Sequence, residues 1–231
     1  MDAHAPDEEI MLLEHAFNSA NPEAFCNVPR FARWLEDQDA RPAYAYLDRL
    51  LRFLQWQKKR AGQQADRWVL KTPHHIGFTD IFFETFPEAK VVLTHRDPLE
   101  TVPSMCSLVH SIRVLNTDHV DELEIGRQWG GRLSRMIERC LDVHDRFPDR
   151  FLDLHYRELI ADPMASAQRI YDFAGICLTP EVERNMRQWA VENARDKRPV
   201  HRYTLDQFGF TKAGLRRDFA RYYERFIDPV V

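Results

Sequence analysis

The sequence predicts an α/β fold in which helices cover both faces of a parallel β-sheet. Three short apolar runs, at residues 67–73, 90–97 and 150–156, alternate with longer segments whose apolar residues recur with helical spacing. Strands joined through helices pair in parallel, because a tight turn can join only an antiparallel pair. We expect one domain over residues 1–231, divided into a helical region at 1–66, the α/β core at 67–175 and a second helical region at 176–231.

Two amphipathic helices are expected before the first strand. The first covers residues 7–17 and has acidic residues in its first turn, where the helix dipole favours them. The second covers residues 42–59. Their apolar stripes are Ile10, Leu12, Leu13, Ala16 and Phe17 in the first helix and Tyr46, Leu47, Leu50, Leu51 and Leu54 in the second. Each stripe has the spacing that lets a helix bury one face.

The later elements follow in alternation. The first strand stops at Thr72 and Pro73, because the residue before a proline and the proline itself both disfavour continued pairing. A short helix leads to the second strand, and two helices lead to the third. The expected helices lie at about 78–87, 98–112, 121–147, 163–176, 179–195 and 212–226.

Composition excludes several classes of protein. Lys and Arg number 32 against 36 Asp and Glu, so the net charge of −4 favours neither nucleic acid nor an anionic membrane as a partner. We expect no signal peptide and no membrane span, because no apolar run approaches the roughly 18 residues that a span needs. The four cysteines show no CxxC pair, which argues against a zinc site or a disulfide framework. A soluble cytoplasmic protein with reduced, mostly buried thiols is expected.

Basic residues are concentrated near the end of the chain. Residues 195–225 carry nine basic and four acidic side chains, whereas residues 1–40 carry two basic and nine acidic ones. Local anion binding is one interpretation, and a solvated helix face is the simpler one. The arginines alternate with aromatic residues that are expected to pack in the core: Arg216, Arg217, Arg221 and Arg225 with Phe219, Tyr222, Tyr223 and Phe226.

Polar and cationic residues follow the ends of the three expected strands. In parallel sheets ligands bind beyond the carboxyl ends of the strands, which directs attention to Lys71, Arg96 and Tyr156. Arg96 is followed eight residues later by Ser104, so a guanidinium and a hydroxyl could hold one phosphate or sulfate group from two sides. The alternative is an ion pair of Arg96 with Asp97 or Glu100 and an ordinary solvated Ser104.

Three sequence motifs together resemble a known family. The segments "WVLKTPHH", "FPEAKVVLTHRDPLETVPSM" and "DLHYRELIADP" are similar, in order and spacing, to those of bacterial sulfotransferases that use 3′-phosphoadenosine 5′-phosphosulfate (PAPS). The resemblance extends from "HAPDEEIMLLEHAF" to "HRYTLDQFGFTKAGLRRDFARYYERF". It implies a three-layer sheet like that of P-loop NTPases, transfer of a sulfuryl group from PAPS to a hydroxyl of a small molecule, lipid or carbohydrate, and no metal.

The resemblance assigns nucleotide-binding roles to four residues. Arg96 and Ser104 match the pair that grips the 3′-phosphate of the nucleotide. Tyr156 would lie near the adenosine, and the segment "RPVHRYTLDQFGF" resembles the loop that folds over the nucleotide. Within that loop Arg202, and His201 beside it, could add to the 3′-phosphate site, although a solvated Arg202 is equally compatible with the sequence.

The resemblance also suggests the catalytic residues. Lys71 matches a lysine near the transferring sulfuryl group, where a cation offsets charge developing on the bridging oxygen. The acceptor hydroxyl must lose its proton, which requires a histidine or carboxylate as the base. We expect His75, which matches the family's K-[ST]-P-x-H pattern, rather than Glu9. The other candidates are His4, His74 and Glu8. The alternative for His74 and His75 is a capping group or a polar residue at the start of the next helix.

One part of the family pattern is missing from the sequence. None of the eight glycines lies in a strand–loop–helix that could hold the 5′-phosphosulfate, and no Walker motif occurs. We therefore expect the chain to start inside the domain, without the N-terminal strand–loop–helix, and to bind PAPS poorly and turn over slowly or not at all. The alternative function is a non-catalytic nucleotide-binding or scaffold fragment of the family. A P-loop kinase or triphosphatase is disfavoured by the missing Walker motif.

Overall fold

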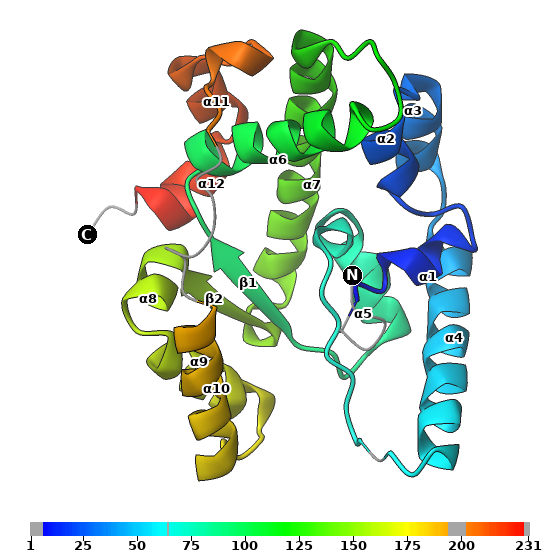
Figure 1. Cartoon of the computed structure of the whole chain (residues 1–231), viewed down its shortest axis with the longest axis vertical. Coiled ribbons are helices and arrows are strands. Elements are labelled where there is room, and N and C mark those ends of the chain that lie inside the picture. Colours follow the sequence, from blue (N-terminus) through cyan, green and yellow to red (C-terminus); the bar gives the residue numbers. More distant parts are fainter. Residues whose placement is uncertain (1–6, 64, 194–201, 229–231) are drawn as a thin grey trace.

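The computed structural model of the chain describes residues 7–63, 65–193 and 202–228. Within these ranges the regular elements form a helix-rich α/β arrangement around a short parallel sheet (Figure 1). The helices are α1 Ile10–Glu14, α2 Asn21–Phe25, α3 Pro29–Asp37, α4 Arg41–Arg60, α5 Thr79–Thr85, α6 Pro98–Arg113, α7 Glu122–Arg146, α8 Tyr156–Ala161, α9 Pro163–Ala174, α10 Pro180–Glu192, α11 Lys212–Asp218 and α12 Ala220–Tyr222. The strands are β1 Val91–His95 and β2 Phe151–His155, and short helical turns are η1 Pro73–Phe78, η2 Pro148–Arg150, η4 Asp206–Phe208 and the π-helical η5 Tyr223–Ile227.

The predicted second and third strands pair in parallel, as the sequence indicated. Val91 lies opposite Phe151 and His95 lies opposite His155. The chain passes from β1 to β2 through α6 and α7, which is the crossover that a parallel pair requires. Because both strands end at the same level, the next residues, Arg96 and Tyr156, leave the sheet side by side.

The strand predicted at residues 67–73 is wrong. Residues 67–72 form no regular element, and the side chain of Val69 is 87% exposed. The backbone N–H of Lys71 donates to the Glu9 carboxylate at 2.9 Å instead of to a neighbouring strand. Without a ladder partner on either side, an apolar run of this length cannot be stabilised as a strand.

Several helices begin at a residue whose side chain caps the first turn. Asp97, Asp121, Asp162, Thr179 and Thr211 each accept backbone N–H groups at the first turn of α6, α7, α9, α10 and α11. These caps satisfy N–H groups that have no partner within the helix. The predicted helix at 212–226 is divided at Phe219 into α11, α12 and η5. Helices α2 and α3 were not predicted, because they are short and bury few residues.

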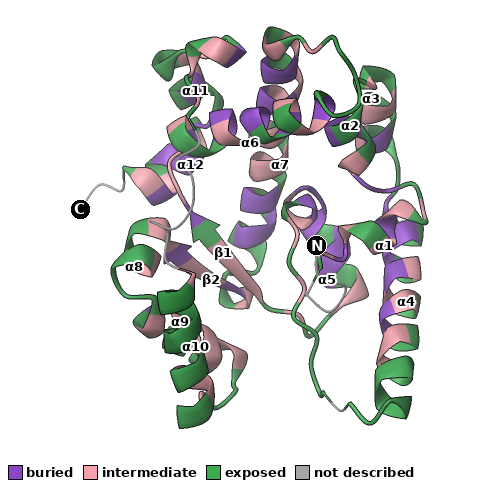
Figure 2. Cartoon of the chain, in the orientation of Figure 1, coloured by how far each residue is buried: buried purple, intermediate pink, exposed green. Residues whose placement is uncertain are grey.

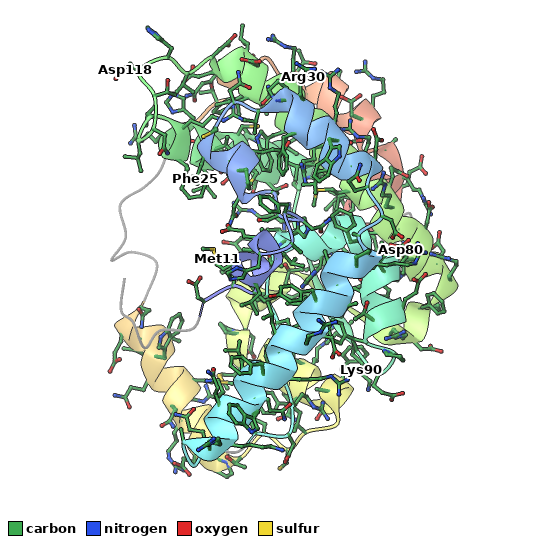
Figure 3. The ribbon with its side chains drawn as sticks, turned by 90° about the vertical axis from the view of Figure 1, so that its right-hand side faces the viewer. Met11, Phe25, Arg30, Asp80, Lys90 and Asp118 are labelled. Carbon is green, nitrogen blue, oxygen red and sulfur yellow. The ribbon has the colours of Figure 1, made fainter. Side chains whose placement is uncertain are left out.

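The buried side chains form three clusters around α7. One cluster joins α1, α4 and α5 to Phe151 of β2, a second joins α6 and α7 to the C-terminal aromatics, and a third joins α2, α6 and α7 to Phe208. Figure 2 shows the corresponding burial along α7, whereas α10 and the lower half of α4 are exposed. Seen from the right-hand side of Figure 1, α1 with Met11 lies on one flank of α4 and Asp80 of α5 on the other (Figure 3).

The C-terminal aromatics pack in the core as expected, but two of the arginines form ion pairs with α7. Arg221 donates to Asp142 at 2.7 Å and to Asp145 at 2.5 Å on α7. Arg225 donates to Asp145 as well and to His144 Nδ1 at 2.7 Å. These two arginines therefore help to hold the C-terminal segment onto α7.

Candidate functional site

The turn that follows β1 carries the predicted phosphate-binding residues. His95 ends the strand, Asp97 caps α6 by accepting the Leu99 N–H at 2.8 Å, and Arg96 lies between them. Ser104 lies on α6, one and a half to two turns into the helix, and is partly exposed. The local order of strand, turn and capped helix thus fixes the spacing of Arg96 and Ser104.

Arg96 and Ser104 line the same pocket. It has a volume of about 530 Å³ and runs along α6, with a lining of Arg96, Thr101, Ser104, Met105, Leu108 and Ser111. The Arg96 guanidinium carbon lies 4.4 Å from the centre of the Tyr156 ring, which follows from the register of the two strands. The structure therefore brings three of the four expected nucleotide-binding residues together.

The ion pair that was the alternative interpretation of Arg96 is also present. Arg96 Nε donates to the Glu100 carboxylate at 2.6 Å, one turn along α6. Partial burial disfavours the charged guanidinium, but the hydrogen bond to Glu100 and its negative charge outweigh it, and the pKa of Arg96 is raised. Arg96 is a permanent cation at the mouth of the pocket, where an anion would compete with Glu100.

Arg202 is exposed and belongs to the segment that leads toward η4. Its neighbour Tyr203 donates to the backbone carbonyl of Glu100 at 3.3 Å, so this segment lies against the first turns of α6. His201 and His4 lie outside the described residues.

A second polar cluster joins three elements on the other side of α7. His75 Nε2 bonds Glu9 Oε1 at 2.8 Å, and the Tyr44 hydroxyl bonds His75 Nδ1 at 2.8 Å. Glu9 precedes α1, Tyr44 lies on the buried face of α4 and His75 belongs to η1. A neutral imidazole satisfies both bonds, with Nε2–H donating to the carboxylate and Nδ1 accepting from the hydroxyl.

The electrostatics of this cluster favour an ionised Glu9. Burial raises the pKa of Glu9. The hydrogen bonds from His75 and from the Lys71 backbone N–H together lower it by more, so the net shift of the pKa is downward. Burial holds the pKa of the Tyr44 hydroxyl well above its usual range, so the hydroxyl remains a donor. Glu9 is thus a carboxylate that stays charged although only 7% of the residue is exposed.

The Lys71 side chain points away from this cluster. Its ammonium group pairs with Glu8, and 77% of the side chain is exposed. Only its backbone N–H contacts Glu9. None of the six residues lining the α6 pocket is Lys71, His75 or Glu9, so the expected catalytic and nucleotide-binding residues form two separate groups.

His74 is buried and differs from His75 in its surroundings. Its Nε2 lies 3.3 Å from Asn18 Oδ1, and its Nδ1 has no hydrogen-bond partner within the described ranges. Burial lowers its pKa to about 3, and the nearby His75 adds to this effect. His74 is therefore neutral at physiological pH.

Sequence reasoning missed three tyrosines that contact these groups. Tyr44 lies outside the apolar stripe that the sequence predicts for the helix at 42–59. The sequence predicts only core packing for Tyr222 and Tyr223. The hydroxyls of Tyr222 and Tyr223 bond His95 and Asp97, on either side of Arg96. No spacing rule signals such bonds, because the partners lie 31, 127 and 126 residues away in the sequence.

The chain belongs to the sulfotransferase family, whose model matches residues 1–180. It superposes on the crystal structure of sulfotransferase STF9 from Mycobacterium avium with a TM-score of 0.87 and 32% identity, over 98% of this chain and 57% of that chain. For STF1 from Mycobacterium tuberculosis the TM-score is 0.80 and the identity 31%, over 96% of this chain and 56% of that chain. An omega-hydroxy-beta-dihydromenaquinone-9 sulfotransferase of Mycobacterium bovis is 28% identical over 60% of this chain and 36% of its own length.

The chain is thus similar to little more than half of each solved structure and to about a third of the curated relative. The fold class expected from the sequence is confirmed by these likenesses.

None of the helices in the described parts of the chain is long and apolar enough to cross a membrane. In the same ranges all four cysteines are free, and Cys26 and Cys177 are exposed, contrary to the expectation that most thiols would be buried.

Proposed function

We propose that this chain carries the 3′-phosphate site of a PAPS-dependent sulfotransferase and the acid–base cluster that serves it. The observation that supports the proposal most directly is the α6 pocket, which Arg96 and Ser104 both line. A permanent cation and a hydroxyl at one pocket suit a phosphate monoester, because both can donate hydrogen bonds to its oxygens. The residues that line the α6 pocket therefore fit the 3′-phosphate end of the nucleotide.

PAPS would supply the sulfuryl group, and the chain's own residues would bind and orient it. Arg96 and Ser104 would hold the 3′-phosphate, and Tyr156, stacked on the Arg96 guanidinium, would keep that group facing the pocket. Arg202 would add a further cation from the segment against α6. Glu100, which now neutralises Arg96, would give up its hydrogen bond when a phosphate takes its place.

We propose Glu9 as the base, with His75 holding it in place. Both ring nitrogens of His75 are engaged, by Glu9 and by Tyr44. Each carboxylate oxygen of Glu9 receives one hydrogen bond and keeps a further lone pair for an acceptor hydroxyl. This assignment reverses our expectation that His75 would be the base. Lys71 would supply positive charge to the bridging oxygen, while its backbone N–H fixes Glu9.

The acceptor is a hydroxyl-bearing small molecule, lipid or carbohydrate in this proposal. The mycobacterial relative is named for a hydroxylated menaquinone, which is consistent with a lipid acceptor. The free thiols support a reducing, cytoplasmic location.

Calorimetric titration with adenosine 3′,5′-bisphosphate and with 5′-AMP tests the nucleotide site. We expect the chain to prefer the bisphosphate, and Arg96→Ala to abolish the preference. Arg187→Ala is the matched control, because Arg187 also pairs with a glutamate on the same helix, Glu183. Equal affinity of the unaltered chain for both nucleotides would refute the site.

Transfer of labelled sulfuryl from PAPS to a panel of alcohols tests the chemistry. We expect transfer to depend on Glu9, so that Glu9→Gln loses it while bisphosphate binding stays unchanged. Bisphosphate preference without transfer to any alcohol would favour the non-catalytic nucleotide-binding module instead.

A further inference from the structure

The turn that carries Arg96 is bonded on both sides by two consecutive tyrosines from the C-terminal segment. The Tyr222 hydroxyl bonds Nδ1 of His95, the residue directly before Arg96, at 3.1 Å. The Tyr223 hydroxyl donates to Asp97 Oδ1 at 2.5 Å. The two residues on either side of Arg96 are therefore each held by a hydroxyl group that comes from more than 120 residues later in the chain.

We propose that Tyr222 and Tyr223 are positioning residues that set the preference for a 3′-phosphate. This inference rests on the nucleotide site proposed above. Tyr222 fixes, through His95, the backbone from which Arg96 extends. Tyr223 bonds the same oxygen of Asp97 that caps α6, the helix that carries Ser104. The two hydroxyls thus fix the positions of Arg96 and of the helix that carries Ser104, the two residues proposed to bind the 3′-phosphate.

The direction of the Tyr222 hydrogen bond is set by the residues behind it. His95 Nε2 bonds Asp153 Oδ1 at 2.8 Å, and Asp153 also bonds His144 Nε2 at 2.9 Å. The hydrogen bonds from both histidines lower the pKa of Asp153 despite its partial burial, so it accepts from both. In a neutral imidazole with Nε2–H directed at Asp153, His95 Nδ1 has a lone pair, and Tyr222 donates to it.

Both hydroxyls are buried and neutral. Tyr222 is 6% exposed and Tyr223 3% exposed. Burial raises the pKa of Tyr222 to about 12, and burial together with the bond to Asp97 raises that of Tyr223. A hydroxyl that is buried together with its hydrogen-bond partner holds its position far better than one that exchanges with water. The Phe226 ring stacks on His95 at 3.8 Å between centroids and keeps water from this network.

The test compares Tyr222→Phe, Tyr223→Phe and the double variant of the full chain by calorimetric titration with both nucleotides. Each substitution removes one oxygen and keeps the ring, so we expect the fold to persist. The ratio of bisphosphate affinity to 5′-AMP affinity should fall on the order of fivefold in each single variant. Tyr46→Phe is the matched control, because Tyr46 lies on α4, on the opposite side of the molecule (Figure 1).

Amide hydrogen exchange gives a second measurement that needs no nucleotide. The Arg96 amide should exchange faster in Tyr222→Phe and the Leu99 amide faster in Tyr223→Phe, while the amide of Val109, farther along α6, keeps its rate. Uniformly faster exchange would indicate general destabilisation and overturn the inference.

The outcomes separate this inference from the proposed function. A preference for the bisphosphate that survives unchanged in both folded variants overturns the positioning role and leaves the nucleotide site intact. If the unaltered chain shows no preference, both the site and its positioning residues are refuted.

Discussion

The carboxylate of Glu9 and the imidazole of His75 meet at 2.8 Å although they lie 66 residues apart in the sequence. The bond joins the start of α1 to η1, and Tyr44 of α4 bonds the other ring nitrogen at 2.8 Å. Both carboxylate oxygens of Glu9 accept hydrogen bonds, one from His75 and one from the Lys71 backbone. This cluster contains Glu9 and His75, two of the three catalytic residues expected from the sequence.

Replacement of Glu9 by glutamine should lower stability at neutral pH by about 1–2 kcal/mol, because a charge-assisted hydrogen bond is lost. The folded pKa of Glu9 is lowered, so its contribution is present above the unfolded pKa of about 4.3 and disappears as the pH falls through the folded pKa. Urea denaturation at pH 7 and in acid measures the difference. Glu8→Gln is the control, since Glu8 pairs with an exposed lysine and should change stability by less than about 1 kcal/mol. A pH-independent loss for Glu9→Gln would contradict this account.

Replacement of Glu100 by glutamine should strengthen binding of adenosine 3′,5′-bisphosphate by about two- to fivefold. Glu100 occupies the Arg96 guanidinium at 2.6 Å and carries a negative charge close to the proposed phosphate. An exposed pair of this kind contributes roughly 0.2–1 kcal/mol, which sets the size of the gain. Titration calorimetry gives the affinities, and Glu183→Gln on α10 removes an equivalent pair elsewhere. Weaker binding by Glu100→Gln would show that the pair supports the site.

Replacement of Gly126 by alanine should destabilise the chain by about 1–3 kcal/mol through overpacking. A Cβ atom at this position of α7 would lie 1.9 Å from the backbone carbonyl oxygen of Phe208, which cannot swing aside as a side chain can. Gly131 on the same helix is the control, because the nearest atom there is the flexible end of Arg135, at 3.1 Å. Gly131→Ala should be neutral or stabilising by up to about 1 kcal/mol, since alanine favours helices. Equal thermal stability of the two variants would argue against close packing of η4 on α7.

Replacement of Glu23 by alanine should destabilise the chain by about 3–5 kcal/mol. Glu23 forms an ion pair with Arg132 in which both side chains are less than one-tenth exposed. Burial already lowers the pKa of Arg132 to about 10, and removal of its partner would leave a buried, unpaired charge. Glu36→Ala removes the much more exposed pair with Arg135 and should cost about 1 kcal/mol or less. Chemical denaturation of both variants measures the contrast, and similar losses would mean that burial of the Glu23 pair has no energetic effect.

The strands at 91–95 and 151–155 could be predicted because their signals are local. Each is a short apolar run beside a turn, and the helices between them require parallel pairing. The false strand at 67–73 shows the limit of that reasoning. The run has the right composition, but a strand exists only where a neighbour offers hydrogen bonds, and the Lys71 backbone bonds the Glu9 side chain instead.

The α/β class, the order of the two strands, and the placement of Arg96 at a strand end with Ser104 on the helix that follows could all be predicted from the amino-acid sequence. These are consequences of side-chain periodicity and of turn and capping residues, which act over a few positions. The tertiary structure alone decided that Glu9, His75 and Tyr44 share one network and that Tyr222 and Tyr223 hold the ends of the Arg96 turn. Hydrogen bonds between side chains depend on which residues the packed helices bring within about 3 Å, and residues far apart along the chain carry no pattern that encodes that distance.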